Sequence, residues 1–89
     1  MRREGARRRV GGVTVVAAAG GPGSPRVGIL AGRAVGSAVE RNRAKRRLRE
    51  AVARAPIRHD RDYVVIAGRA VLEASFEDVV GWVARGVEE

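Results

Sequence analysis

Three apolar runs rich in β-branched residues predict strands. They cover residues 13–18 (VTVVAA), 26–31 (RVGILA) and 62–67 (DYVVIA). The segment GGPGSP at 20–25 has the composition of a turn, so residues 13–31 are expected to form a hairpin with an enlarged loop. Residues 7–10 are a candidate partner strand for the first run, with Gly11-Gly12 as the bend between them.

The pattern changes to a helical one after Gly36. Residues 38–55 contain no Gly or Pro and are rich in Ala, Arg, Leu and Glu, which favours a helix. Ser37 is a suitable N-cap, and Pro56 ends the helix. On a helical projection an apolar arc of about 100° contains Ala44, Leu48, Ala51, Val52 and Ala55.

A last helix is expected over residues 75–86, with Ser75 as its N-cap and Asp78 in the place where a capping box usually has Glu. The element order strand–strand–helix–strand–helix predicts an α/β (α+β) two-layer sandwich. In it, a small, mixed, mostly antiparallel sheet packs against the two helices. With 89 residues, the chain is expected to be a single domain, 1–89, that begins with a polar segment over 1–12.

Charge narrows the choice of partner. The formal net charge is +8, and its distribution is uneven: residues 1–69 carry 17 basic and 5 acidic side chains, whereas residues 70–89 carry 1 and 5. All the cations except Lys45 are Arg, and the planar guanidinium suits bidentate contact with phosphate. A cationic field of this size favours a polyanionic partner, either nucleic acid or an acidic membrane surface.

The remaining composition argues against catalytic chemistry in the chain itself. Cysteine is absent, which excludes disulfides and thiolate metal sites and is compatible with a reducing cytoplasm. His59 is the only histidine and stands in a polar connection, so no Ser-His-Asp or Cys-His set can be assembled. The glycines over 20–23 lack the Lys-Ser/Thr of a phosphate-binding loop.

The helix over 37–55 carries the strongest functional signal. Six cations and one amide stand within nine consecutive positions: Arg41, Asn42, Arg43, Lys45, Arg46, Arg47 and Arg49. A solvated basic face is the alternative interpretation, since most charge runs have no further role. Asn42 favours binding instead, because Asn is a poor helix former whose amide can pair with backbone or base edges.

The stretch VGSAVERNRAKRRLREA, residues 35–51, resembles the signature of the bacterial ribonuclease P protein subunit. The signature positions fall on Gly36, Ala38-Val39, Arg41-Asn42-Arg43, Lys45-Arg46 and Arg49-Glu50. Residues 26–29 are similar to the family's Arg-Val-Gly strand, residues 62–67 to the strand after its basic helix, and Ser75-Phe76-Glu77 to the start of its last helix. The resemblance covers about residues 5–85.

The resemblance implies a protein subunit of an endoribonuclease whose catalyst is RNA with bound Mg²⁺, and no metal held by the protein alone. It also implies a left-handed crossover around the basic helix. The expected partners are the catalytic RNA and precursor tRNA, whose 5′ leader is removed in the cytoplasm; no membrane or obligate protein partner is expected. The candidate RNA-binding residues are Arg33, Arg41, Asn42, Arg43, Lys45, Arg46, Arg47, Arg49 and Arg69.

The chain departs from the family's pattern at three places. It begins near the end of the family's N-terminal helix, which leads us to expect a shortened form. Gly32-Arg33-Ala34 stands where Ser-Lys-Lys is common, and the strand over 13–18 has no aromatic residue. A general RNA-binding or ribosome-associated module is the alternative function. Binding to an anionic membrane is the weaker one, because the apolar arc of the helix is mostly alanine.

Overall fold

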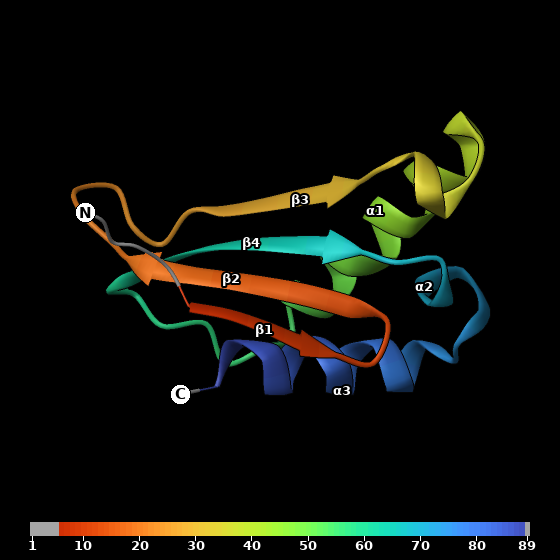
Figure 1. The fold of residues 1–89 in the computed structure, drawn as a ribbon. Coiled ribbons are helices and arrows are strands. Elements are labelled where there is room, and N and C mark those ends of the chain that lie inside the picture. Colours follow the sequence, from red (N-terminus) through yellow and green to blue (C-terminus); the bar gives the residue numbers. More distant parts are fainter. Residues whose placement is uncertain (1–5, 89) are drawn as a thin grey trace.

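A computed structural model describes residues 6–88 of the chain (Figure 1). Its strands are β1 (Ala6–Val10), β2 (Val13–Ala19), β3 (Val27–Ala31) and β4 (Arg61–Ala67). Its helical elements are the 3-10 turn η1 (Arg33–Val35), α1 (Ala38–Val52), α2 (Ala70–Glu73) and α3 (Phe76–Val87). The polar segment expected over 1–12 lies partly outside the described residues, and its described part consists of β1 and the turn after it.

The strands form one sheet in the order β1-β2-β4-β3. β2 pairs antiparallel with both β1 and β4, whereas β3 runs parallel to β4. The mixed, mostly antiparallel sheet and the pairing of β1 with β2 are therefore confirmed. The hairpin expected over 13–31 is wrong, because β4 lies between β2 and β3.

The loop after β2 makes this insertion possible. It reaches across the start of β4, where the Gly20 N–H donates to the Asp60 carbonyl at 2.8 Å and the Tyr63 N–H donates to the Arg26 carbonyl at 2.9 Å. β4 also suits the central position better than β3, because it buries Tyr63 and Val65 while β3 leaves Leu30 53% exposed. An apolar run predicts a strand, but it does not say which strand is its neighbour.

β3, α1 and β4 form a βαβ crossover. In Figure 1 both strands point the same way, β3 lies above β4, and α1 passes behind the sheet, which makes the crossover left-handed. Such crossovers are right-handed in nearly all proteins. The resemblance therefore predicts the handedness correctly where the general rule fails.

α1 and α3 pack side by side on one face of the sheet, behind it in Figure 1. The core between the two layers contains, among others, Val13, Val15, Leu48, Tyr63, Val65, Val79 and Val83, each at most 2% exposed. The two-layer α/β sandwich is therefore confirmed. Its other face carries no helix from the described residues.

The basic helix ends three residues earlier than expected. α1 stops at Val52, and the next residues form tighter turns in which Arg54 N–H donates to the Ala51 carbonyl and Ala55 N–H to the Val52 carbonyl. The residue before a proline avoids the helical conformation, so Pro56 affects the chain before its own position. Sequence patterns also gave no sign of the short α2.

Candidate nucleic-acid interface

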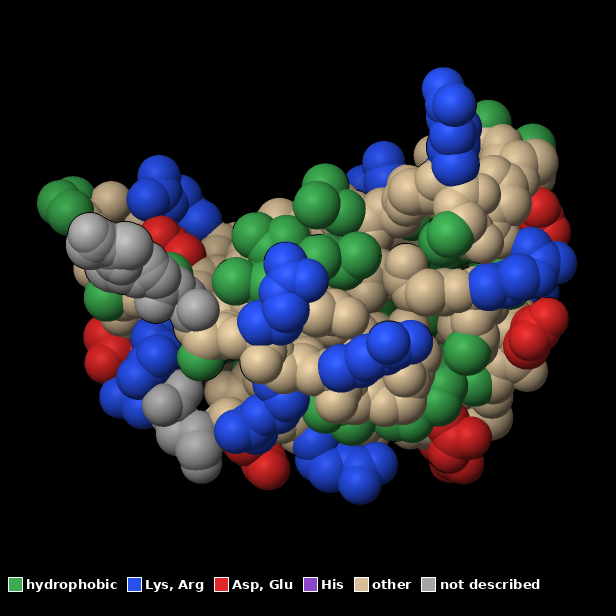
Figure 2. All heavy atoms as spheres, viewed as in Figure 1, with side chains coloured by type: hydrophobic (Ala, Val, Ile, Leu, Met, Phe, Trp, Pro, Cys, Tyr) green, Lys and Arg blue, Asp and Glu red, His purple; other side chains and the backbone are tan. Residues whose placement is uncertain are grey.

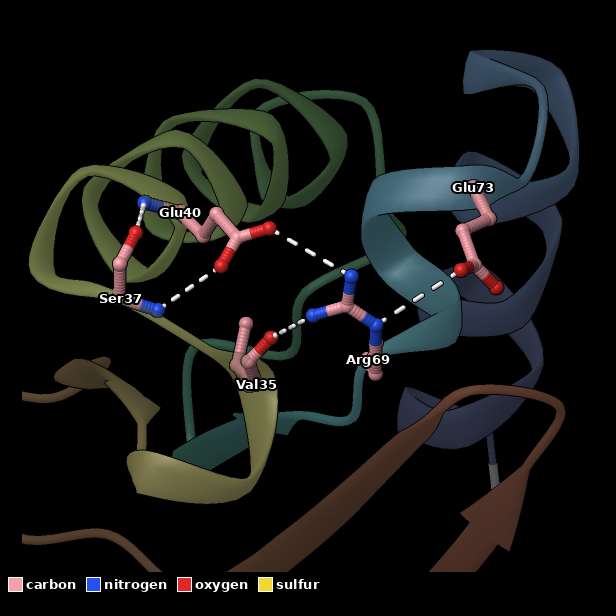
Figure 3. Close-up of polar contacts among 5 residues, drawn as sticks. All are labelled: Val35, Ser37, Glu40, Arg69 and Glu73. Atoms are coloured by element: carbon pink, nitrogen blue, oxygen red, sulfur yellow. Dashed lines mark hydrogen bonds and ion pairs between the residues drawn. The ribbon is translucent and has the colours of Figure 1, made fainter.

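α1 begins with a capping box. The Ser37 Oγ accepts a hydrogen bond from the Glu40 N–H at 3.2 Å, and the Ser37 N–H donates to Glu40 Oε1 at 2.8 Å (Figure 3). These bonds satisfy N–H groups that a helix start leaves without partners. They therefore fix the residue at which the helix that carries the arginines begins. The spacing Ser-x-x-Glu in the sequence is typical of a capping box, and it indicates Glu40 as the partner of Ser37.

The hydrogen bonds at this cap also lower the pKa of the Glu40 carboxyl. The bond from the Ser37 backbone is the largest cause, and the positive charge of Arg69 lowers the pKa further. Burial opposes the shift without reversing it. Glu40 is therefore a carboxylate at neutral pH and can hold a cation.

The two faces of α1 differ sharply. Ala44, Leu48 and Ala51 are fully buried against the rest of the fold, as the apolar arc predicts. On the other side, the side chains of Arg43, Arg46 and Arg49 are exposed, one turn after another. Guanidinium groups at this spacing form a row that can contact successive phosphates of an RNA strand.

The other predicted residues of the helix divide into two groups. Asn42 is exposed beside Arg43, and Arg41 and Lys45 are half-buried at the margins of the basic face. Arg47 instead points into the fold, where its Nη2 donates to the Ala74 carbonyl at 2.6 Å. The structure thus gathers six of the seven on one accessible surface, which we call the α1 basic face: Arg41, Asn42, Arg43, Lys45, Arg46 and Arg49.

The two predicted residues outside α1 lie near its start. Arg33 is exposed on η1, directly before the helix. Arg69 follows β4, and its guanidinium contacts the Val35 carbonyl at 2.6 Å, Glu40 at 3.4 Å and Glu73 at 3.7 Å (Figure 3). Arg33 is therefore an exposed cation beside the start of α1, whereas Arg69 is already engaged within the protein.

Sequence reasoning gave no role to a carboxylate that organises the other end of the sheet. Asp62 accepts hydrogen bonds from Ser24 Oγ at 2.8 Å, from the Arg26 N–H at 3.0 Å and from Arg26 Nη2 at 3.1 Å. These bonds, that of Ser24 first, lower the pKa of the Asp62 carboxyl. Asp62 therefore ties the loop over 20–25 to the start of β4.

The face of the sheet that the helices leave open has its own chemistry. The strand register places Val16 beside Val64 and Ile66 beside Leu30. On β1 the exposed Arg7 stands opposite Val16 in the ladder. Figure 2 shows hydrophobic side chains gathered over β3 and β4 on this face, with Lys and Arg side chains beside them. Such a surface can contact the bases and phosphates of an extended strand.

Residues 6–88 contain no candidate metal centre. His59 is exposed in the connection between α1 and β4. No three His, Asp or Glu side chains in this part of the chain lie where they could hold a metal ion. Over the same residues, no helix is long and apolar enough to cross a membrane.

Comparison with known proteins identifies the family. The sequence model of the family described as Ribonuclease P matches residues 1–88. The chain belongs to the ribonuclease P family. The family assignment made from the Arg-Asn-Arg segment is therefore confirmed.

Curated relatives agree with this assignment. The chain is 53% identical over 60 residues to the ribonuclease P protein component of Symbiobacterium thermophilum, a match that covers 64% of this chain and 52% of the relative. It is 49% identical over 55 residues to that of Lactococcus lactis subsp. cremoris, covering 61% and 47%. The matched region spans about half the length of these relatives.

Solved structures of the family share the fold. The ribonuclease P protein of Thermotoga maritima superposes with a TM-score of 0.80 at 28% identity, over 94% of this chain and 82% of that one. The protein of Staphylococcus aureus gives a TM-score of 0.69 at 22% identity, over 91% and 76%. The second comparison supports the fold alone.

Proposed function

We propose that the chain is the protein subunit of ribonuclease P and that it binds the catalytic RNA through the α1 basic face. The observation that carries the proposal is the row of Arg43, Arg46 and Arg49 on the exposed side of a helix whose opposite side is buried against the fold from Ala44 onward. The family assignment supplies the identity of the RNA. Arg33 is exposed on η1, directly before the helix, and adds a cation beside the start of α1.

In this proposal the RNA catalyses the reaction, and the protein reduces the electrostatic repulsion between the catalytic RNA and the precursor tRNA. Precursor tRNA and catalytic RNA are both polyanions, so their union is opposed by repulsion between phosphates. Arginines on the α1 basic face neutralise phosphates and release counterions. The complex should then form, and remove the 5′ leader, at a lower concentration of Mg²⁺. Mg²⁺ would be bound with the RNA rather than by a cluster of protein carboxylates.

The open face of the sheet is the part of the protein that we propose for the leader. It lies on the opposite side of the sheet from α1 and combines the exposed Leu30 and half-buried apolar side chains with exposed arginines of β1. Val16, Val64 and Ile66 can pack against bases, and Arg7 can pair with phosphates. The face has no aromatic ring among its described residues, so we expect contacts to the leader that depend little on its sequence.

Reconstitution tests the proposal. The protein is added to the catalytic RNA and a precursor tRNA at a Mg²⁺ concentration too low for the RNA to act alone. We expect release of the 5′ leader to be restored, and the doubly substituted Arg43→Ala/Arg46→Ala protein to restore less. Binding to the RNA without restored cleavage would instead favour the general RNA-binding module. Arg85→Ala is the matched control, because Arg85 is exposed on α3, away from the α1 basic face.

A further inference from the structure

The first turns of α1 project beyond the core. The helix buries Ala44, Leu48 and Ala51, but none of its own residues before Ala44 is buried. Val39 is 77% exposed, and Asn42 and Arg43 are exposed as well. Side-chain packing therefore holds the middle and the end of α1, and it leaves the Arg-Asn-Arg segment without an apolar anchor of its own.

One guanidinium group ties this projecting segment to the sheet. Arg69 stands two residues after the end of β4. β3 ends at the same end of the sheet, and the chain continues from there toward α1. Arg69 Nη1 donates to the carbonyl of Val35, which is itself fully buried, and Arg69 Nη2 pairs with Glu40 in the first turn of α1. On α2, Glu73 Oε2 lies 3.7 Å from Arg69 Nε and forms a further ion pair (Figure 3).

Gly36 shows how closely this corner is packed. Its φ is +141°, a conformation that side-chain-bearing residues rarely adopt. A Cβ built there would collide with the Glu40 carboxylate and lie 3.0 Å from Arg69 Nη1. The glycine therefore leaves the space in which Glu40 and Arg69 meet.

We propose that Arg69 is a positioning residue, which holds the start of α1 so that Arg41, Asn42 and Arg43 face the RNA in a fixed orientation. This inference rests on the proposed function and changes the role expected for Arg69 from direct contact to support. A fixed orientation favours binding because less conformational freedom is lost when the complex forms. Glu40 acts with Arg69, although its negative charge alone would repel RNA.

The sign of the effect of Glu40 separates the two roles. If Arg69 contacts phosphate, Glu40→Gln frees its guanidinium and removes a negative charge beside the RNA, so binding should tighten. If Arg69 positions the helix, Glu40→Gln should weaken binding about three- to tenfold. Gln retains the oxygen that accepts from the Ser37 N–H, and capping boxes accept Gln, so the helix start should still form. Glu50→Gln is the matched control: it removes the same charge from an exposed site on the same helix.

The experiment measures the affinity of each full-length variant for the catalytic RNA across a series of salt concentrations. We expect Glu40→Gln to bind more weakly than Glu50→Gln. We also expect Arg69→Ala to lose affinity while log affinity keeps its wild-type slope against log salt. The proposal is overturned if Glu40→Gln binds as tightly as Glu50→Gln. It is equally overturned if Arg69→Ala flattens the slope by about 0.7–0.9, the value of one phosphate contact.

The wild-type protein in the same assay keeps this inference separate from the proposed function. If the wild type neither binds the catalytic RNA nor restores cleavage at low Mg²⁺, the proposed function fails. If the wild type does both and the Glu40 and Arg69 variants behave as phosphate contacts, only the positioning role fails. Arg69→Lys adds a further test, because an ammonium group cannot bond Val35 and Glu40 in the same fork geometry. We therefore expect Lys to rescue affinity only partly.

Discussion

Arg47 and Ala74 join the basic helix to the last helix: Arg47 Nη2 donates to the Ala74 carbonyl at 2.6 Å. The carbonyl belongs to the residue that ends α2 and precedes the N-cap of α3. Near this point Arg54 lies over the ring of Phe76, 5.0 Å from its centroid. Arg47 thus supports the fold from the basic helix, and Arg54, although exposed, also contacts the start of α3.

Replacing Arg47 should therefore affect stability more than RNA binding. We expect Arg47→Ala to lower the free energy of unfolding by about 1.5–3 kcal/mol, the usual loss for a hydrogen bond from a charged group. Arg46→Ala, one position earlier and exposed, should change it by less than about 0.5 kcal/mol. Urea unfolding of both variants checks this. Equal stabilities would show that the bond to Ala74 does not support the fold.

RNA binding should respond differently to the loss of an arginine and to the loss of the Asn42 amide. For Arg43→Ala or Arg46→Ala we expect weaker binding to the catalytic RNA and a salt slope flatter by about 0.7–0.9. Asn42→Ala should lose affinity with little change of slope, because a neutral amide releases no counterion. Affinity measured from low to moderate salt tests both. Wild-type affinity and slope in folded Arg43→Ala and Arg46→Ala proteins would remove α1 from the interface.

The sequence predicted the parts of this fold that depend on local chemistry. The apolar spacing of Ala44, Leu48 and Ala51 marks the buried side of α1, and the β-branched runs mark the strands. The position of β4 between β2 and β3 could not be predicted in this way, because it depends on hydrogen bonds between residues far apart in the chain, such as Tyr63 with Arg26.

The candidate interface also combines features that the sequence predicts with features that depend on long-range contacts. A count of charges cannot distinguish Arg46, which is exposed, from Arg47, which bonds a carbonyl 27 residues away. Nor does it show that Arg69 is engaged by Val35 and Glu40. Composition identifies the helix as basic, and only the three-dimensional arrangement tells which cations remain available.

Asp62 should make stability depend on pH. Its hydrogen bonds lower the pKa of the carboxyl in the folded protein, so the unfolded chain binds the proton more readily. The contribution of Asp62 is then complete above the ordinary aspartate pKa of about 3.9 and is lost as pH falls through the lower folded value. Urea unfolding between neutral pH and pH 2 should show this loss. Asp62→Asn should reduce the dependence, and an unchanged profile would contradict the assignment.

Two glycines of α3 provide a paired test of how closely that helix packs on the sheet. A Cβ on Gly86 would collide with the side chain of Val15 on β2, whereas a Cβ on Gly81 would meet no atom within 4 Å. We expect Gly86→Ala to lower the free energy of unfolding by about 1–3 kcal/mol through overpacking. Gly81→Ala should raise it by about 0.5–1 kcal/mol, because Ala loses less backbone freedom in a helix. The melting temperature should therefore fall for Gly86→Ala and rise for Gly81→Ala, although the two positions are only five residues apart in the same helix. A Gly86→Ala protein as stable as the Gly81→Ala protein would mean that α3 lies farther from β2 than the structure places it.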